Sequence, residues 1–596
     1  MNALPLDTTT PAAAEADESL TLGRMLAYGA PGFAGAAMAI PIGILMPRFY
    51  SDVVMAPLGT IALAMAIARS LDALTDPVMG WISDRTRSRW GRRKPWIALG
   101  VPPCAIVFYL LFAPPESLSG PPAGIWFGVT FALYYIFHTI YQIPHGALGA
   151  ELALDYNERS RLFGVQSLFI LTGIMVAAVA PAVLQDGFGM ENERQVYALI
   201  AASFAAALVI LYSVLLRYVP ERADFKQRES NPLVPGVRRA LRNRPFRVLF
   251  IAGMIASVPA AIPGILAPYY TTYVLGVENP DSWLGLLLIV YFGTGLLAVP
   301  MWMWLARRYG KLWTIILSSS IGIVGGSTLF FIPPEAAELV VVIFFLMGIS
   351  SSTGMVILPS MGADVIDYDE FLTGKRREAQ FGSFWAIMPK FVAIPGAAVP
   401  LAILAWVGYV PNQVQSPEVV LSIRLMLGVF PAAFNIAAIF VLLRYPISQT
   451  VHEKIRAGIR AHTAGEEFPD PITGSLVAAP QHRAVDDKIG WFLDSFSPRE
   501  LRRVVGKGLA NAQFDVLLAA AVSLAFTAGA IATAFAAVPD LSHEPGPAAV
   551  FAVVAAGLGI TATVFHLLRL APARKLAASD IPNERIRAHL ADTAAH

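Results

Sequence analysis

Long apolar runs separated by short polar segments make up most of the chain. A helix that crosses a bilayer needs about 17–25 mainly apolar residues. Runs of that kind lie at 24–46, 58–80, 96–114, 123–144, 162–184, 196–218, 247–275, 282–306, 312–333, 338–360, 380–407, 420–444, 512–537 and 547–569. The pattern predicts fourteen membrane-spanning helices, grouped along the chain as six, six and two.

The composition agrees with a membrane protein. Charged residues make up 14% of the chain, whereas a soluble domain carries about 25%, so too few polar residues remain to cover a soluble surface. We therefore expect an all-α protein that crosses the membrane many times. The charge balance, with 44 basic and 42 acidic residues, gives no reason to expect nucleic acid as a partner. The single cysteine, Cys104, cannot form an intrachain disulfide.

Two similar halves follow one another. The second span leads into "DRTRSRWGRRK" and the eighth into "ARRYGK", so the same kind of basic, glycine-containing turn recurs. Transporters built of repeats place their site at the midplane between the halves. We expect a disordered cytoplasmic tail (1–20), a six-helix bundle (21–218), a cytoplasmic linker (219–246), a second six-helix bundle (247–445), a cytoplasmic linker with a short amphipathic helix (446–511), two additional spans (512–570) and a cytoplasmic tail (571–596).

The basic residues also predict the orientation. Lys and Arg are enriched in short cytoplasmic loops, and here they gather after the second, sixth, eighth and tenth spans. Both termini are therefore expected in the cytoplasm. Ser497 and Glu500 have the spacing of a helix capping box, which predicts the short helix in the later linker.

Two acids interrupt the second apolar run. Asp72 and Asp76 lie four residues apart and share one helix face with Thr75. An ionised acid at bilayer depth costs about 2.5–3.5 kcal/mol, and Arg69, one turn earlier, supplies a single positive charge. A bound cation would balance the second acid, with Thr139 of the fourth span as a further oxygen ligand. Sodium would suit these oxygens, and a proton shared by the carboxylates is the alternative. A purely structural Arg69–Asp72 ion pair is the other interpretation.

Polar and aromatic side chains in other spans suggest a substrate cavity. His138, Gln142 and His145 share one face of the fourth span, and Lys390 is a costly charge within the eleventh. The expected substrate contacts are Gln142, His145, Tyr141, Trp385, Lys390 and Tyr270.

Several long stretches resemble one known transporter family. "SLDALTDPVMGWISDRTRSRWGRRKPWI", "IPHGALGAELALDYNERSRLFG" and "ADVIDYDEFLTGKRREAQFGSFWAIMPK" are similar to signatures of the glycoside–pentoside–hexuronide:cation symporters, within the major facilitator superfamily. The resemblance covers about residues 24–445. It implies two six-helix bundles, to which this chain adds two helices, and a site for sodium, lithium or a proton at Asp72, Thr75, Asp76 and Thr139.

The sugar ligands of that family transfer poorly. Its Lys-Asp pair in the first span matches Gly35 and Ala36, its fourth-span aspartate and tryptophan match Gln142 and Gly146, and its fifth-span arginine matches Ser167; only Lys390 agrees. We expect cation-coupled symport of a sugar or glycoside by alternating access. The alternative is transport of a lysophospholipid or another amphiphile, because vertebrate lysophospholipid transporters resemble a branch of the same family.

Charged residues on the cytoplasmic side predict a gate. Arg85, Arg92 and Arg93 are expected to pair with Glu151, Asp367 or Asp369 when the cytoplasmic gate is shut, since exposed pairs worth about 0–1 kcal/mol can open again.

The sequence also bears on activity, oligomeric state and location. No nucleophile–base constellation predicts an enzyme, and no cofactor is expected beyond the coupling cation. We expect a monomer in a bacterial inner membrane. A third hypothesis, of a different functional class, is a membrane receptor or scaffold that does not transport.

Overall fold

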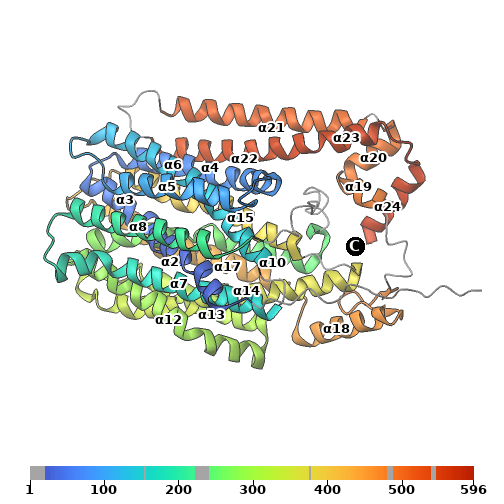
Figure 1. Ribbon diagram of the computed structural model, residues 1–596, viewed down its shortest axis with the longest axis horizontal. Helices are drawn as coiled ribbons and strands as arrows, with labels where there is room; N and C mark the ends of the chain where they lie inside the picture. The colour runs from blue at the N-terminus through green and yellow to red at the C-terminus, as the bar shows by residue number, and fades with distance from the viewer. Residues whose placement is uncertain are drawn as a thin grey trace, which may run out of the picture.

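The structure is a computed structural model (Figure 1) that describes residues 20–152, 156–221, 240–374, 378–479, 488–509, 511–538 and 545–595. Nearly all of the predicted N-terminal tail, most of the 219–246 linker and part of the 446–511 linker lie outside these residues.

The N-terminal half contains the first six spans. The first is interrupted at prolines, which remove backbone donors, and consists of α1 (Leu22–Gly29), α2 (Pro31–Ile40), the π-helix η1 (Pro41–Leu45), α3 (Met46–Arg48) and the π-helix η2 (Phe49–Val53). The others are α4 (Leu58–Arg85), α5 (Lys94–Phe112), α6 (Gly120–Leu152), α7 (Tyr156–Ala182), continued by η3 (Val183–Gly187), and α8 (Glu193–Tyr218).

The C-terminal half repeats this plan. Its first span is again interrupted, as α10 (Arg244–Ser257), α11 (Ile262–Tyr269) and η5 (Tyr270–Leu275). It continues with α12 (Pro280–Tyr309), α13 (Lys311–Thr328), the short η6 (Pro334–Ala336), α14 (Leu339–Thr373), α15 (Glu378–Trp406), and a last span of α16 (Pro417–Arg424), η7 (Leu425–Val429) and α17 (Phe430–Leu442).

The remaining chain adds a polar unit and two long helices. It contains α18 (Gln449–Thr463), a two-stranded antiparallel sheet of β1 (Phe468–Pro469) and β2 (Leu476–Val477) in which Phe468 pairs with Val477, α19 (Lys488–Leu493), α20 (Pro498–Lys507), α21 (Asn511–Ala536), α22 (Pro547–Leu568), α23 (Leu570–Ala577) and α24 (Asn583–Ala595).

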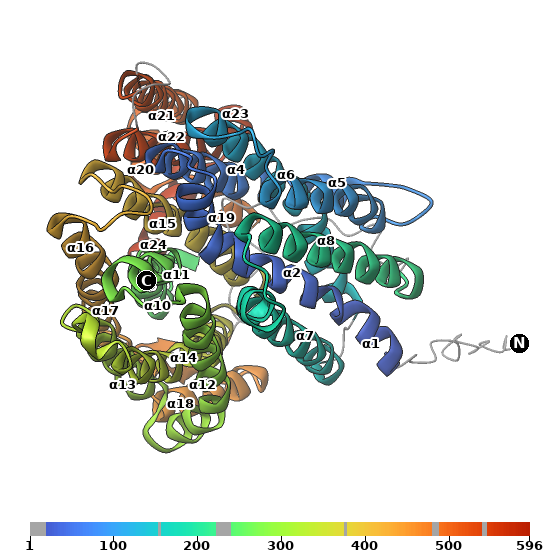
Figure 2. The ribbon, with the colours of Figure 1, turned by 90° about the vertical axis from the view of Figure 1, so that its left-hand side faces the viewer.

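The all-α membrane architecture is confirmed. Twelve helices in the described residues are long and apolar enough to cross a membrane, and α13 and α15 fall at the predicted ninth and eleventh spans. Seen along the bundle axis, α1–α8 and α10–α17 form two groups of helices (Figure 2). They meet where α4 packs on α15, α7 on α12, and η1 on α11.

The two added helices lie beside one of these meeting lines. In Figures 1 and 2 α21 is outermost, and α22 lies between α21 and the main bundle. Helix α22 contacts both α4 and α15, so it touches one helix from each half.

The polar C-terminal segments contain more structure than the sequence predicted. The expected helix is present as α20, with a complete capping box between Ser497 and Glu500. Four further helices, α18, α19, α23 and α24, lie in segments that we expected to be linker or tail. Helices α19, α23 and α24 form a small separate core with α20, in which Leu501, Val504 and Ile586 are buried. Helix α18 packs on α14 instead, where Ile455 is buried.

Candidate cation and substrate site

The four predicted cation ligands come together. Asp72 and Asp76 lie one turn apart on α4, each 8% exposed, and face α6. Thr139 Oγ1 lies 3.1 Å from Asp72 Oδ1 and 2.9 Å from Asp76 Oδ1. Thr75 Oγ1 lies 3.4 Å from the Thr139 hydroxyl. A hydroxyl carries one hydrogen, so Thr139 can donate to only one carboxylate at a time. The Oδ1 atom of the other carboxylate then keeps a free lone pair.

Lys390 completes this cluster from the other half of the molecule. Its ammonium on α15 lies 2.9 Å from Asp72 Oδ2 and also binds Asp76 Oδ2. The Lys390 side chain is 37% exposed, whereas the side chain of each aspartate, taken without its backbone, is 10% exposed. Two carboxylates thus share one ammonium, and that ammonium has open space beside it.

Arg69 does not take the place of Lys390. Its guanidinium lies over the ring of Tyr135, 5.6 Å from the centroid, and its Nε has no hydrogen-bond partner. Within the described residues Arg69 forms no ion pair with Asp72. The alternative of a structural Arg69–Asp72 pair is therefore wrong.

Gln142 and Trp385 occupy different places. Gln142 on α6 is exposed, with Oε1 3.5 Å from the Tyr212 hydroxyl. Trp385 faces α10 instead, edge-on to Phe250 with centroids 5.8 Å apart, and its indole lies against Gly253. Gly253 lines a cavity of about 410 Å³ inside the C-terminal half, together with hydroxyl and amide side chains such as Ser318, Ser350, Thr353 and Asn435.

Three expected substrate contacts are instead packing residues. Tyr141 is fully buried against Tyr212. His145 is 1% exposed, and its two ring nitrogens lie 3.0 Å from the Tyr212 hydroxyl and 3.3 Å from the Tyr28 carbonyl oxygen. The Tyr270 hydroxyl donates to the Leu329 carbonyl at 2.9 Å. Neighbouring helices cover these three side chains in this structure, and helical spacing alone does not identify which neighbour covers a face.

Two of the expected gate arginines bind the expected acid. Arg92 and Arg93 reach Glu151 Oε1 at 2.6 and 2.9 Å, and Arg93 also binds Asp84 at 2.5 Å. Arg85 lies over the Trp81 ring at 4.1 Å. These contacts stay within the N-terminal half.

An unpredicted acid orders the same turn. Glu221, just after α8, accepts hydrogen bonds from the backbone N–H groups of Arg92, Arg93 and Lys94 at 2.5–2.7 Å. Its carboxylate lies against Gly91, which has φ +108° and no room for a side chain. A carboxylate at the start of α5 is favoured by the helix dipole.

The structure places the expected acids of the C-terminal half on α14. Asp367 lies 3.0 Å from His452 Nε2 on α18, and Asp369 is buried at 2% exposure. Lys311 binds Asp364 at 2.7 Å. The expected pairing of the arginines with Asp367 or Asp369 is not among the contacts described here.

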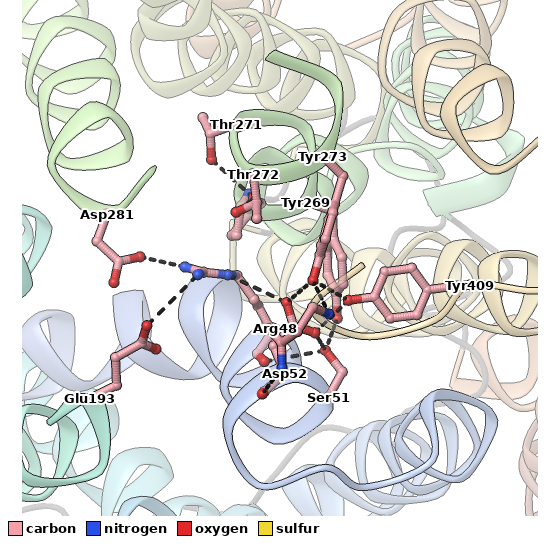
Figure 3. A network of polar contacts seen from close by, with 12 residues as sticks. Arg48, Ser51, Asp52, Glu193, Tyr269, Thr271, Thr272, Tyr273, Asp281 and Tyr409 are labelled. Carbon is pink, nitrogen blue, oxygen red and sulfur yellow. Dashed lines mark hydrogen bonds and ion pairs between the residues drawn. The ribbon is translucent and has the colours of Figure 1, made fainter. Parts of the chain in front are cut away.

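A polar network that sequence reasoning missed joins the halves (Figure 3). It lies before the start of α4, whereas the first basic turn follows the end of α4. Arg48 at the end of α3 binds Asp281 at the start of α12, at 2.6 Å. Arg48 also lies 3.6 Å from Asp52 and 4.0 Å from Glu193.

Asp52 is the centre of this network. It accepts hydrogen bonds from Ser51 at 2.6 Å and Tyr273 at 2.7 Å, and also from Tyr409. Asn412 donates to its carbonyl oxygen at 2.8 Å. The halves are therefore held together at this end. The signal in the sequence was the charged pair of Arg48 and Asp52 near the end of the first apolar run.

Comparison with known proteins agrees with this architecture. The family described as MFS/sugar transport protein matches residues 27–449. The chain belongs to this family. Residues 450–596 lie outside the match, so α21 and α22 are additions to the family fold.

Individual relatives are distant but extend over most of their length. The isoprimeverose transporter of Lactiplantibacillus pentosus is 26% identical, over 70% of this chain and 87% of its own. The sodium-dependent lysophosphatidylcholine symporter 1-B of Danio rerio is 22% identical, over 73% and 89%. The crystal structure of the nucleoside transporter NupG, 13% identical, has a TM-score of 0.51 and covers 71% of this chain and 99% of that one. The chain is a membrane transporter with the major facilitator fold.

Proposed function

We propose that this protein is a symporter that couples the entry of a cation at Asp72 and Asp76 to the uptake of a sugar or glycoside. The observation that carries the proposal is the arrangement of two carboxylates, the Thr139 hydroxyl and one shared ammonium at the meeting line of the two halves. One charge of −1 stays unbalanced among the groups in contact, and a monovalent cation or a proton would neutralise it.

Because Lys390 comes from the other half, it offers a route for coupling. A cation that enters between the carboxylates competes with the ammonium of Lys390 for the same oxygens. The displaced ammonium then has three donors free for a substrate oxygen. Cation and substrate raise each other's affinity by the same factor, as linkage requires.

The network around Asp52 supports a state that is closed at one end. If the basic turns face the cytoplasm, as Lys and Arg enrichment suggests, the closed end faces outward and the described conformation would release its cargo inside. At the inner end, the ion pairs of Glu151 with Arg92 and Arg93 join residues of the N-terminal half to one another. We place the protein in a bacterial inner membrane.

Two observations support our choice of substrate class. The residues described around the 410 Å³ cavity include no charged side chain, which suits an uncharged ligand. Helix α22 also covers the meeting line of α4 and α15, which would close one lateral route from the bilayer. Both favour a water-soluble sugar or glycoside, with Gln142 and Trp385 as contact candidates. The lysophosphatidylcholine symporter among the relatives keeps a lysophospholipid as the second candidate.

Reconstituted vesicles test the proposal. Asp76→Asn should abolish uptake driven by a sodium or proton gradient and remove the stabilisation of the purified protein by that cation. Thr139→Val should weaken cation binding about tenfold, because it removes one ligand oxygen worth about 1–1.5 kcal/mol. Thr130→Val is the matched control, since Thr130 is buried on the same helix and donates to backbone carbonyls of that helix instead of to the carboxylates. Uphill uptake with unchanged ion dependence in Asp76→Asn would refute the site.

A further inference from the structure

The basic turn of the C-terminal half borders a cavity that the transport site does not use. This cavity, of about 710 Å³, lies at the basic end between the α12–α13 turn, α14 and the start of α18. Its polar lining comprises Arg307, Arg308, Lys311, Ser360, Asp364, Ser448, Gln449, Thr450 and His452.

The lining carries an excess of positive charge. Lys311 is neutralised by Asp364, at 2.7 Å. Arg307 and Arg308 are exposed, and neither forms an ion pair with a described acid. Three cations against one carboxylate leave two positive charges facing the cavity.

The equivalent turn of the N-terminal half has acidic partners for its arginines that the basic turn of the C-terminal half does not show among the described residues. There Glu151 binds both arginines, and the Glu221 carboxylate accepts three backbone N–H groups at the start of α5. At the start of α13 no described side chain accepts from the first N–H groups, and Gly310 and Lys311 line the cavity instead. An anion from outside the chain would complete the C-terminal turn as Glu221 completes the N-terminal one.

The surroundings indicate that this anion is a lipid phosphate. Tyr309 and Trp313 line the cavity and are 60% and 61% exposed, and Trp304 nearby is 61% exposed. Aromatic side chains at the ends of spanning helices mark the headgroup level of the bilayer. Basic pockets between spanning helices on the cytoplasmic side bind anionic headgroups.

We propose that Arg307, Arg308 and the start of α13 bind the phosphate of an anionic phospholipid from the leaflet at the basic end. The apolar chains of that lipid would lie along the exposed aromatic side chains. This site is separate from the carboxylate pair on α4 and does not depend on which substrate is carried.

Native mass spectrometry of the full-length protein, titrated with phosphatidylglycerol or phosphatidylcholine, tests the proposal. Arg307→Gln/Arg308→Gln should weaken phosphatidylglycerol binding by roughly thirtyfold, since each basic residue near an anionic surface contributes about a factor of five. The matched control is Arg87→Gln/Arg89→Gln, which removes the same charge from exposed positions of the N-terminal basic turn. Thermal unfolding in each lipid checks that both variants are folded.

Three outcomes would overturn the proposal. The first is an equal loss of phosphatidylglycerol binding in both double variants, which would indicate general surface attraction. The second is binding of phosphatidylcholine by the unaltered protein as tight as its binding of phosphatidylglycerol. The third is displacement of the lipid by equimolar inorganic phosphate, which would identify a site for soluble phosphate.

Discussion

At the scale of the residue, the central feature is the sharing of one ammonium by two carboxylates. Asp72 and Asp76 each have one oxygen toward Thr139 and one toward Lys390. Removing one partner from a buried ion pair costs about 3–5 kcal/mol because the remaining charge stays buried. The occupancy of this cluster by lysine or by a mobile cation should therefore be finely balanced.

Replacing the lysine should favour the mobile cation. In Lys390→Gln the two carboxylates have no internal counter-charge, so cation binding should tighten by about tenfold or more while gradient-driven uptake is lost. Calorimetric titration of the purified variant with sodium, repeated at two pH values, measures the affinity. Weaker binding in Lys390→Gln would show that the lysine supports the cation instead of competing with it.

At the scale of the element, the added helices are held by close packing and by one buried ion pair. Gly557 on α22 lies against Ser70 on α4: a Cβ at this glycine would be 3.1 Å from the Ser70 hydroxyl oxygen. At the C-terminal end of α22, Arg569 is 1% exposed and binds Glu500 of α20 at 2.5 Å. The membrane hairpin and the polar C-terminal unit are thus joined.

A larger side chain at position 557 should push α22 away from α4. Gly557→Leu is expected to destabilise the protein by about 1–3 kcal/mol, the usual cost of overpacking. Gly529→Leu on α21 is the matched control, because a Cβ there meets nothing within 4 Å. Denaturation followed by intrinsic fluorescence would compare the two variants, and equal stabilities would show that α22 is not seated on α4.

The Glu500–Arg569 pair predicts a pH dependence. Burial alone would raise the pKa of Glu500, but the Ser497 backbone N–H and the Arg569 guanidinium outweigh burial and hold the pKa below its ordinary value of 4.5. A lowered pKa means that the stabilisation is complete above pH 4.5 and disappears as the pH falls further.

Hydrogen exchange in α20 and α23, corrected for the intrinsic effect of pH, should therefore accelerate in acid. In Glu500→Gln the exchange of these helices should already be fast at neutral pH and should change little with acid. A variant that keeps the wild-type pH profile would assign the transition to another group.

At the scale of the whole molecule, the two halves are joined by polar contacts at one end. The ion pair of Arg48 with Asp281 and the hydrogen bonds to Asp52 cross from one half to the other (Figure 3). At the basic end, the ion pairs of Arg92 and Arg93 with Glu151 join residues of one half. Rocking of the halves would require the first set to break while new contacts form at the other end.

Weakening the closed end should open it. Asp281→Asn leaves Arg48 without its closest partner, and the loss of about 3–5 kcal/mol should shift the ratio of closed to open molecules by roughly a hundredfold or more. Glu191 and Val414 are exposed in different halves. Spin labels attached at Glu191→Cys and Val414→Cys, in a Cys104→Ala background, should lie farther apart with Asp281→Asn than without it. The control is Glu278→Gln, because Glu278 is an exposed acid close to Asp281 in sequence. Identical distances in the labelled parent, Asp281→Asn and Glu278→Gln would show that Asp281 does not hold this end closed.

The sequence alone determined the spans, their grouping and the acids on α4. These are local properties: a bilayer requires a minimum apolar length, and a four-residue spacing places two side chains on one helix face. The capping box of α20 was predictable for the same reason, since its two hydrogen bonds join residues three apart.

Only the tertiary structure decided which side chains meet across helices. It brought Lys390 to acids more than 300 residues away, covered Tyr141, His145 and Tyr270, linked Arg48 to Asp281, and placed α22 against both halves. Periodicity specifies the face on which a side chain lies. The partner of that face depends on how the helices pack, and packing is a property of the assembled bundle.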